Sequence, residues 1–372
     1  MLLSEIIIQK IQKEGPISFH DFMEMSLYYP ALGYYNALKT TIGKEGDFYT
    51  SPHLTPAFGA MIARQIEQMW SITGEEAFTI VEYGAGTGIL CHDILDYLKS
   101  NSKLYGGLTY CIIEKSAIMK QRQQTHLHEK VSWCNNIHDI PAITGCILSN
   151  ELIDNFSVHQ VVMDDGLMEV FVDYKNGFVE LLQPANKTLK EYMAELGVQL
   201  PKGFRTEINL EAREWLKEIA ASLKKGYLIT IDYGCSSAEL YSRRRKCGTV
   251  VCYNKHQVNE DPYHDIGKQD ITAHVNFSAL CYWGLKSGLA CCGQATQANF
   301  LLALGFKDYL IKTIEPESDI MKMAKKEAFL SYTLLVDMGD KFKVLIQRKG
   351  IGSQQLLGLT FSNPPIHHLT EE

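Results

Sequence analysis

The chain has 372 residues, a formal net charge of −7, and 46% hydrophobic against 21% charged residues. This composition is typical of a globular, enzyme-like chain, and the length predicts either one nucleotide-type domain with large insertions or two lobes. No apolar run approaches the ~18 residues of a membrane span, and the negative charge disfavours a nucleic-acid partner. The ten cysteines lack paired spacing, which predicts reduced thiols.

The chain begins with an amphipathic pattern. Residues 3–11 are apolar at helical spacing, but Glu5 and Lys10 interrupt them, so we expect a helix and not a signal peptide. No cleavage site or Arg-rich transit segment is recognised, which favours the bacterial cytoplasm over a mature mitochondrial form. Two further helices are expected to begin after the N-caps Ser18 and Thr55.

Short apolar runs then alternate with helical patterns. Each run is bounded by polar residues and is apolar throughout, which predicts strands buried on both faces. The runs cover residues 78–83, 108–114, 145–150 and 227–233. This alternation predicts an α/β fold with a doubly wound, mostly parallel sheet. Residues 328–350 are expected to add two antiparallel strands at its edge, joined at residues 338–340.

Three stretches do not fit the alternation. Residues 157–183 contain two hairpin signals, Asp-Gly and Asn-Gly, and predict an inserted three-stranded meander. Residues 184–206 are expected to form a loosely helical connection. Residues 235–276 have the pattern of a long polar loop, and their Tyr, His and Asp content favours a functional loop. Residues 351–372 are expected to be a loosely held tail.

Glycines follow the first predicted strand at alternate positions: Gly84, Gly86 and Gly88. Such a turn lets a polar cofactor group approach the backbone at a helix N-terminus. A dinucleotide fingerprint needs a small residue where Ile89 stands. Glu82 would repel a pyrophosphate and attract the ammonium and sulfonium of S-adenosylmethionine. The turn therefore favours S-adenosylmethionine over NAD, and a tight turn without a ligand is the remaining alternative.

Other cofactor-binding candidates lie near this turn. Glu114 ends the second strand, where it suits hydrogen bonds from ribose hydroxyls of either cofactor. Residues 46–51 are expected to fold over the cofactor as a lid, although a turn that satisfies its own backbone explains them nearly as well. The set is completed by Ala85, by Asn150, and by Asp47, Thr50 and Ser51 of the lid.

Six motifs resemble, in the same order, those of the MidA-like family of S-adenosylmethionine-dependent methyltransferases. They are GDFYTSPHLTPAFG (46–59), VEYGAGTG (81–88), SNELIDNFSVH (149–159), RTEINLEAREWL (205–216), LITIDYG (228–234) and CYNKHQVNEDPYHDIGKQDITAHVNF (252–277). The resemblance implies a class I methyltransferase fold with an inserted α+β lobe. It also implies an activity similar to that of the family's mitochondrial members, which look like protein arginine methyltransferases that act on a core subunit of respiratory complex I and are required for its assembly.

The resulting organisation is a Rossmann-like core interrupted by insertions. We expect a helical and lid segment (1–55), the first part of the cofactor-binding core (56–156), the meander and connection (157–206), more core (207–234), a substrate-side lid (235–295), the C-terminal part of the core (296–350) and a tail (351–372).

An arginine acceptor needs carboxylates, because its guanidinium stays protonated in water. The stretch NELIDN supplies them directly after a buried strand. Glu151 is the first candidate for the guanidinium, with Asp154 assisting or orienting, and capping of a helix is the structural alternative for Glu151. Asn150 and Asn155 are expected either to bind the substrate or to fix the turn.

Weaker candidates come from later stretches. Asp270 and His274 are expected to close over the substrate, with His274 as proton acceptor or orienter, although a structural histidine is an equal alternative. Asp232 and Tyr233 end a strand and are expected to line the acceptor channel. The histidines lack metal-ligand spacing, so we expect no metal.

Three functions remain open from the sequence. The leading one is a protein arginine N-methyltransferase. The others are a small-molecule N- or O-methyltransferase and an assembly or interaction factor that binds S-adenosylmethionine without turnover. The expected partner is a protein substrate, a complex I subunit or another arginine-containing protein, and a homodimer is compatible with the sequence.

Overall fold

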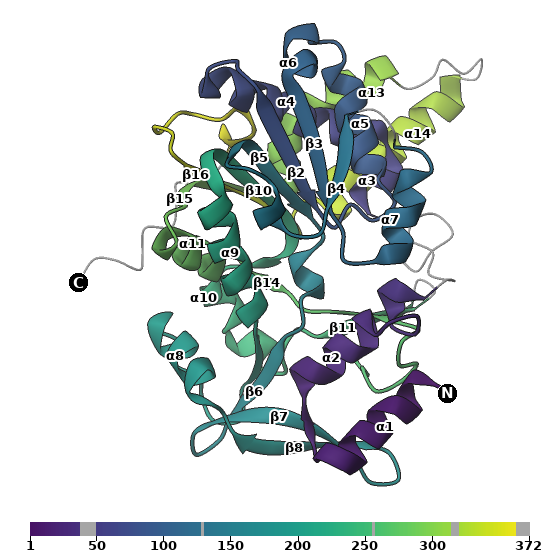
Figure 1. Cartoon of the computed structure of the whole chain (residues 1–372), viewed down its shortest axis with the longest axis vertical. Helices are drawn as coiled ribbons and strands as arrows, with labels where there is room; N and C mark the ends of the chain where they lie inside the picture. Colours follow the sequence, from purple (N-terminus) through teal and green to yellow (C-terminus); the bar gives the residue numbers. More distant parts are fainter. Residues whose placement is uncertain (38–49, 128–129, 255–256, 314–319, 362–372) are drawn as a thin grey trace.

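The computed structural model describes residues 1–37, 50–127, 130–254, 257–313 and 320–361. A large sheet with helices on both faces fills the upper part of Figure 1, and an antiparallel sheet with two N-terminal helices fills the lower part. We call these regions the cofactor lobe and the acceptor lobe. Among the described residues, no helix is long and apolar enough to cross a membrane.

The sheet of the cofactor lobe has the strand order β15-β16-β10-β5-β2-β3-β4, and β14 pairs with the end of β10. Its strands are β2 (Phe78–Tyr83), β3 (Leu108–Ile113), β4 (Val131–Cys134), β5 (Ile143–Asn150), β10 (Leu223–Cys235), β14 (Val275–Asn276), β15 (Ala290–Thr296) and β16 (Phe342–Lys349). In the described part of the sheet, β16 runs antiparallel to both β10 and β15 and the other strand pairs are parallel, so the predicted doubly wound, mostly parallel class is confirmed. All four strands predicted from apolar runs are present, as β2, β3, β5 and β10.

Helices cover both faces of this sheet because its strands are apolar on both sides. One core lies under α4 (Pro56–Thr73), α5 (Ile89–Leu98), α6 (Ser102–Gly107), α12 (Gln297–Ala303) and α13 (Phe306–Thr313). The other lies under α9 (Leu210–Ser222) and α11 (Phe277–Lys286), and α7 (Ala117–Gln124) follows β3. The predicted cap of α4 is confirmed, since the Thr55 side chain accepts a hydrogen bond from the backbone N–H of Ala57.

The predicted meander forms the sheet of the acceptor lobe. Its strands are β6 (His159–Met163), β7 (Leu167–Tyr174) and β8 (Phe178–Pro184), joined antiparallel in sequence order. The sheet is completed by β9 (Arg205–Ile208) beside β6 and by β1 (Ile17–Ser18) beside β7. The helical connection contains α8 (Lys187–Glu195).

Three stretches distant in sequence share one core in the acceptor lobe. The helices α1 (Leu3–Glu14) and α2 (Phe19–Tyr28) pack their apolar faces against the meander. Residues 235–276, expected to be one long loop, instead contain α10 (Ser237–Leu240), the 3-10 turn η4 (Arg243–Arg245) and a small sheet of β11 (Val251–Asn254), β12 (Gln257–Asn259) and β13 (Asp270–Thr272). Cys252 and Ile271 of this small sheet are buried in the same core, which holds the sheet against the two N-terminal helices.

Two expectations near the C-terminus were wrong. Residues 328–337 are not a strand but belong to α14 (Ile320–Tyr332) and the π-helical turn η5 (Thr333–Asp337), because Leu330 and Leu334 are buried four residues apart. The antiparallel strand β16 therefore lies between β10 and β15, and β15 forms the edge. The described part of the predicted tail is packed, since Leu356 is buried and η6 (Leu357–Leu359) lies against α12.

Candidate functional site

A cavity of about 1110 Å³ lies where β2, β5 and β10 end at their carboxyl edge, and residues of both lobes line it. In a doubly wound sheet this edge is where ligands bind. The volume reaches the upper end of the ~300–1,000 Å³ range of small-molecule pockets. The cavity is therefore large enough for a cofactor and part of an acceptor.

The glycine turn forms one wall of the cavity. Gly84 and Gly86 have φ values of 64° and 54°, and both line the cavity together with Ala85. A Cβ added at Gly86 would meet no atom within 4 Å, so the bare backbone faces open space. Gly88, at φ 82°, does not line the cavity; its added Cβ would lie 2.8 Å from Leu127 Cδ1. Its position therefore supports a role in shaping the turn.

Two glutamates flank this turn. Glu82 is buried and accepts a hydrogen bond of 2.8 Å from the Tyr110 hydroxyl, while burial raises its pKa to about 7. Glu114 accepts from the Ser116 backbone N–H at 2.9 Å and from Gln123 Nε2 at 3.0 Å, and burial raises its pKa. Gln123 Nε2 also donates to the Gly86 carbonyl at 2.9 Å. One amide thus fixes Glu114 relative to the glycine turn.

The described lid candidates, Thr50 and Ser51, differ in what their side chains contact. Asp47 lies outside the described residues. Thr50 lines the cavity, whereas Ser51 begins the short helix α3 (Ser51–Leu54), is buried, and donates to Gln297 Oε1 at 3.3 Å. His53, which the sequence did not single out for the cofactor, contacts the Thr50 hydroxyl at 2.6 Å and the Thr87 hydroxyl at 3.0 Å. This imidazole joins α3 to the glycine turn.

Glu151 follows β5 in a left-handed conformation, with φ 52°. Its backbone N–H donates to the Ile231 carbonyl at 2.9 Å, and its side chain lines the cavity. Non-glycine residues rarely adopt this conformation, and such strain clusters at functional sites. Burial, followed by the charge of Asp232, raises the pKa of Glu151 to about 8, although a hydrogen bond from Asn150 opposes the rise.

Asp232 lies beneath the 3-10 turn η3 (Ile153–Asn155) and holds it in place. Its Oδ2 accepts from the backbone N–H groups of Leu152, Ile153 and Asp154 at 3.2, 2.9 and 3.4 Å. Asp232 is fully buried and does not line the cavity, which corrects its expected place in the acceptor channel. Tyr233, the other residue expected there, does line the cavity.

The acidic wall of the cavity consists of Glu151, Asp154 and Asp270. Asp154 is 5% exposed, and its Oδ1 has no hydrogen-bond partner among the described residues. Burial, and then the charges of Asp232 and Asp270, raise the pKa of Asp154 well above its ordinary value. The ionised forms of Glu151 and Asp154 are destabilised by desolvation and by neighbouring carboxylates, so this wall favours a cationic ligand.

Tyr35 and Asn155 hold the third carboxylate of the wall. The Tyr35 hydroxyl lies 2.9 Å from both Asn155 Oδ1 and Asp270 Oδ2. Asn155 Nδ2 donates to Asp270 Oδ1 at 3.3 Å. Asn155 and Asp270, which were predicted separately as site residues, are therefore brought together by a tyrosine that sequence reasoning missed.

His274 also lines the cavity. Its Nδ1 accepts from Arg245 Nη1 at 3.1 Å, and burial followed by the Arg245 charge lowers its pKa to about 4. A neutral ring with Nδ1 occupied is a poor proton acceptor at neutral pH, which favours the structural alternative. Among the described residues, no three side chains form a metal-binding group.

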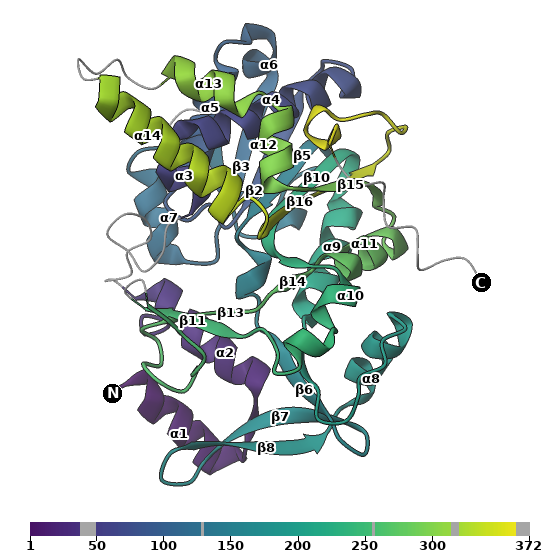
Figure 2. The same ribbon diagram turned by 180° about the vertical axis from the view of Figure 1, so that it is seen from behind.

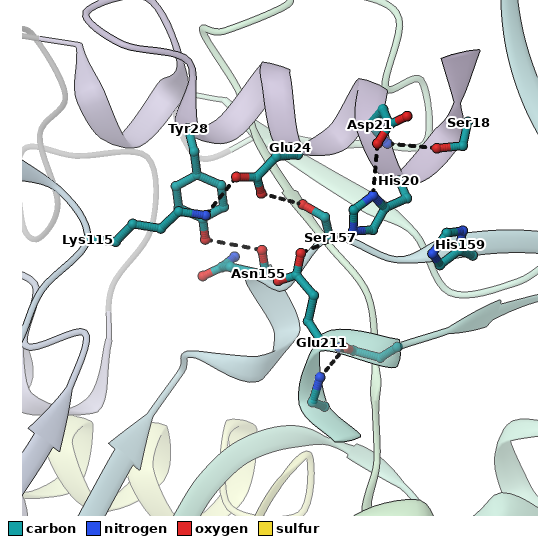
Figure 3. Close-up of polar contacts among 12 residues, drawn as sticks. Ser18, His20, Asp21, Glu24, Tyr28, Lys115, Asn155, Ser157, His159 and Glu211 are labelled. Atoms are coloured by element: carbon teal, nitrogen blue, oxygen red, sulfur yellow. Dashed lines mark hydrogen bonds and ion pairs between the residues drawn. The ribbon is translucent and has the colours of Figure 1, made fainter. Parts of the chain in front are cut away.

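Polar contacts fasten the N-terminal helix α2 beside the site (Figure 3). Lys115 Nζ donates to Glu24 Oε1 at 2.7 Å and lies 3.9 Å from the centre of the Tyr28 ring. The Tyr28 hydroxyl donates to the Asn155 carbonyl at 3.2 Å, and Ser157 Oγ donates to Glu24 Oε2 at 3.0 Å. Tyr28 and Tyr35 both line the cavity, and sequence reasoning identified neither of them as a site residue.

A second contact in Figure 3 connects α2 to the start of α9. His20 lies 3.2 Å from Asp21 and 3.1 Å from Glu211, and these hydrogen bonds raise its pKa to about 9. Its ring stacks on that of His159, with centroids 4.6 Å apart. The cationic imidazole therefore holds Glu211, another cavity-lining residue, toward α2.

The fold and the glycine-lined cavity define a class I methyltransferase. Residues 61–295 match the family described as "Putative S-adenosyl-L-methionine-dependent methyltransferase". A crystal structure of a methyl transferase candidate from Burkholderia thailandensis, bound to S-adenosyl-homocysteine, superposes with a TM-score of 0.86 at 29% identity and covers 98% of this chain and 95% of that one. The chain belongs to this methyltransferase family, which confirms the MidA-like resemblance and the S-adenosylmethionine prediction.

Two curated relatives extend over nearly the whole chain. The protein arginine methyltransferase NDUFAF7 of Bos taurus is 27% identical, and the match covers 91% of this chain and 81% of the relative. The Caenorhabditis elegans homologue is 26% identical over 92% of this chain and 85% of its own length.

Proposed function

We propose that this protein is a protein arginine N-methyltransferase whose acidic wall binds the acceptor guanidinium. The observation that carries the proposal is the position of Glu151. This partly buried glutamate has a strained backbone and lines the cavity together with Asp154 and Asp270. No lysine or arginine lies within 4 Å of the Glu151 or Asp154 carboxyl groups in the described part of the chain. A planar cation with several N–H donors suits this arrangement.

The residues around the glycine turn fit the cofactor. The bare backbone at Gly86 allows close approach, and Asn150 Oδ1 is buried without a partner among the described residues, so it can accept from an ammonium group. Glu114 suits the ribose hydroxyls, and Glu82 adds negative charge beside the turn. When bound, S-adenosylmethionine supplies an activated methyl group on a sulfonium.

The protein's own residues orient the acceptor and take up its proton. Glu151 and Asp154 hold the guanidinium so that one nitrogen points toward the glycine-turn side of the cavity. As the N–C bond forms and the S–C bond breaks, the attacking nitrogen loses a proton to one of these carboxylates. Asp232 positions both groups through the backbone of η3, and Asp270 adds charge from the acceptor lobe.

The curated relatives support this choice of acceptor, since both are named protein arginine methyltransferases. They support it only through whole-chain similarity at 26–27% identity. The proposed partner is therefore a protein with an accessible arginine, and a respiratory complex I subunit is the candidate that the family resemblance gives.

The test is methyl transfer from radiolabelled S-adenosylmethionine to lysate protein, followed by hydrolysis and separation of methylarginines. We expect Glu151→Gln and Asp154→Asn each to reduce labelled methylarginine at least about 100-fold, because each removes a charge from a desolvated site. S-adenosylmethionine affinity should stay within about twofold. The exposed Glu191→Gln variant on α8 is the control and should match the wild type.

If the Glu151→Gln variant formed as much labelled methylarginine as the wild type, binding of the guanidinium by Glu151 would be excluded. Label only in small molecules would support an N- or O-methyltransferase with a small acceptor. Tight cofactor binding without any label would favour a binding factor.

A further inference from the structure

An exposed apolar stripe runs along α14 and η5. Phe329, Tyr332 and Val336 are 60%, 61% and 58% exposed. Their spacing of three and four residues puts them on one side of a helix. Scattered apolar residues are ordinary on protein surfaces, but an aligned group that includes two aromatic rings marks an interaction site.

The C-terminal end of the stripe lies beside the cavity. Thr333, Asp337 and Met338, which alternate with or follow the stripe, line that cavity. Figure 2 shows α14 on the outside of the cofactor lobe, with its C-terminal end toward the middle of the molecule. A protein chain lying on the stripe would therefore reach the cavity without crossing the lobe.

The outer end of the stripe is basic. Lys325 lies one turn before Phe329 on the same side of α14, and Lys326 is its neighbour; both are exposed. On the inner side, Leu330 and Leu334 anchor the helix in the core of the cofactor lobe. The helix is thus fixed from behind and presents an apolar surface that ends in positive charge.

We propose that this stripe is the docking surface for the methyl-acceptor protein, which binds through an apolar patch bordered by carboxylates and inserts its arginine into the acidic wall. The inference rests on the proposed function, because only a protein acceptor extends beyond the cavity. Apolar burial supplies affinity, and Lys325 selects an acidic border on the partner.

The test uses the full chain with the triple substitution Phe329→Ser, Tyr332→Ser and Val336→Ser, and separately Lys325→Glu. The matched control is Leu285→Ser, an equally exposed apolar residue on α11, which both views place on the opposite side of the molecule from α14. Transfer is measured to lysate protein and, in parallel, to N-acetylarginine methylamide, which fills only the cavity.

The triple variant should raise the apparent KM for the labelled protein roughly thirtyfold, equivalent to about 2 kcal/mol, and Lys325→Glu roughly fivefold. Transfer to N-acetylarginine methylamide should remain at the wild-type rate, as should all activities of Leu285→Ser. Unchanged protein KM in the triple variant would overturn the docking surface and leave the proposed function standing.

A second copy of this chain is the competing occupant of the stripe. Conversion of a dimer to a monomer by the triple variant, with protein KM unchanged, would show that the stripe joins two copies and would overturn the proposal. If the wild type labels neither protein nor N-acetylarginine methylamide, the proposed function fails, and the docking surface fails with it.

Discussion

The two walls of the cavity are built in different ways. The cofactor wall comes from neighbouring strands of one parallel sheet, with Glu82 and Gly86 close together in sequence and Glu114 one crossover later. The acceptor wall combines Tyr35 from the N-terminal segment, η3 after β5, and Asp270 from the small sheet. A nearly continuous segment thus forms the wall proposed to bind the cofactor, whereas packing between distant segments forms the wall proposed to bind the acceptor.

This difference means that the two walls can change separately. Changes in α2 or in residues 235–276 can reshape the acceptor wall without disturbing the glycine turn. The predictions below separate the two walls and run from the largest expected effect to the smallest.

Gly86→Val should weaken S-adenosylmethionine binding at least about 100-fold, because the new side chain projects into the cavity from a left-handed backbone. Isothermal calorimetry measures this directly. Gly203→Val is the matched control, since Gly203 also has a positive φ of 82° and open space around its Cβ but does not line the cavity. If both variants lost the same S-adenosylmethionine affinity, backbone strain alone would explain the loss, and the glycine turn would not be the binding site.

Acceptor affinity should rise with pH, because a proton on Glu151 competes with the guanidinium. The pKa of Glu151 is about 8 in the free protein, so the group is mostly protonated below that pH and ionised above it. We expect the affinity for N-acetylarginine methylamide to rise roughly tenfold per unit between pH 6 and 7 and to level off above pH 8. Saturation with S-adenosyl-homocysteine keeps the cofactor site occupied at every pH, and Glu151→Gln should reduce this slope, because only the Asp154 carboxyl group then titrates against the guanidinium.

The sequence predicted the cofactor wall in more detail than the acceptor wall. The strands β2 and β3 were identified from continuous apolar runs, and the glycine turn between them carried a local signal for its ligand. Glu151 and Asp154 were identified because they directly follow a strand. Tyr35 and Tyr28 were missed as site residues, because no local pattern shows that α2 packs beside η3.

Errors elsewhere have a common physical origin. Residues 328–337 are apolar enough for a strand, but burial of Leu330 and Leu334 beneath α14 and η5 made the helix more favourable. Asp232 was expected to end a strand, but β10 continues to Cys235, and backbone N–H groups of η3 occupy the Asp232 Oδ2 atom. Both the helix at residues 328–337 and the buried position of Asp232 depend on tertiary contacts, which cannot be read from a single sequence.

Tyr35→Phe should reduce methyl transfer about five- to tenfold and leave S-adenosylmethionine affinity unchanged. The substitution removes one hydroxyl that holds both Asn155 and Asp270, a loss of roughly 1 kcal/mol. Steady-state kinetics with N-acetylarginine methylamide provides the measurement, and Tyr97→Phe on α5 serves as the control. If the substitution changed only the affinity for S-adenosylmethionine, Tyr35 would act on the cofactor site and not on the acceptor site.

The smallest expected effect concerns the contact between the lobes at Lys115 and Glu24. Both side chains are partly exposed, so their coupling energy should be only about 0.5 kcal/mol. A double-mutant cycle with Lys115→Ala and Glu24→Gln, followed by chemical unfolding, measures it. A coupling above about 2 kcal/mol would show that this ion pair, and not the apolar core, fastens α2.

The most direct test compares a cation with its neutral isostere in the same cavity. Calorimetry at pH 8 on the protein saturated with S-adenosyl-homocysteine would measure N-acetylarginine methylamide against the citrulline analogue. We expect the arginine compound to bind at least about thirtyfold more tightly to the wild type, and the preference to vanish in the Glu151→Gln, Asp154→Asn double variant. Equal affinity of the two compounds for the wild type would contradict a guanidinium site at the acidic wall.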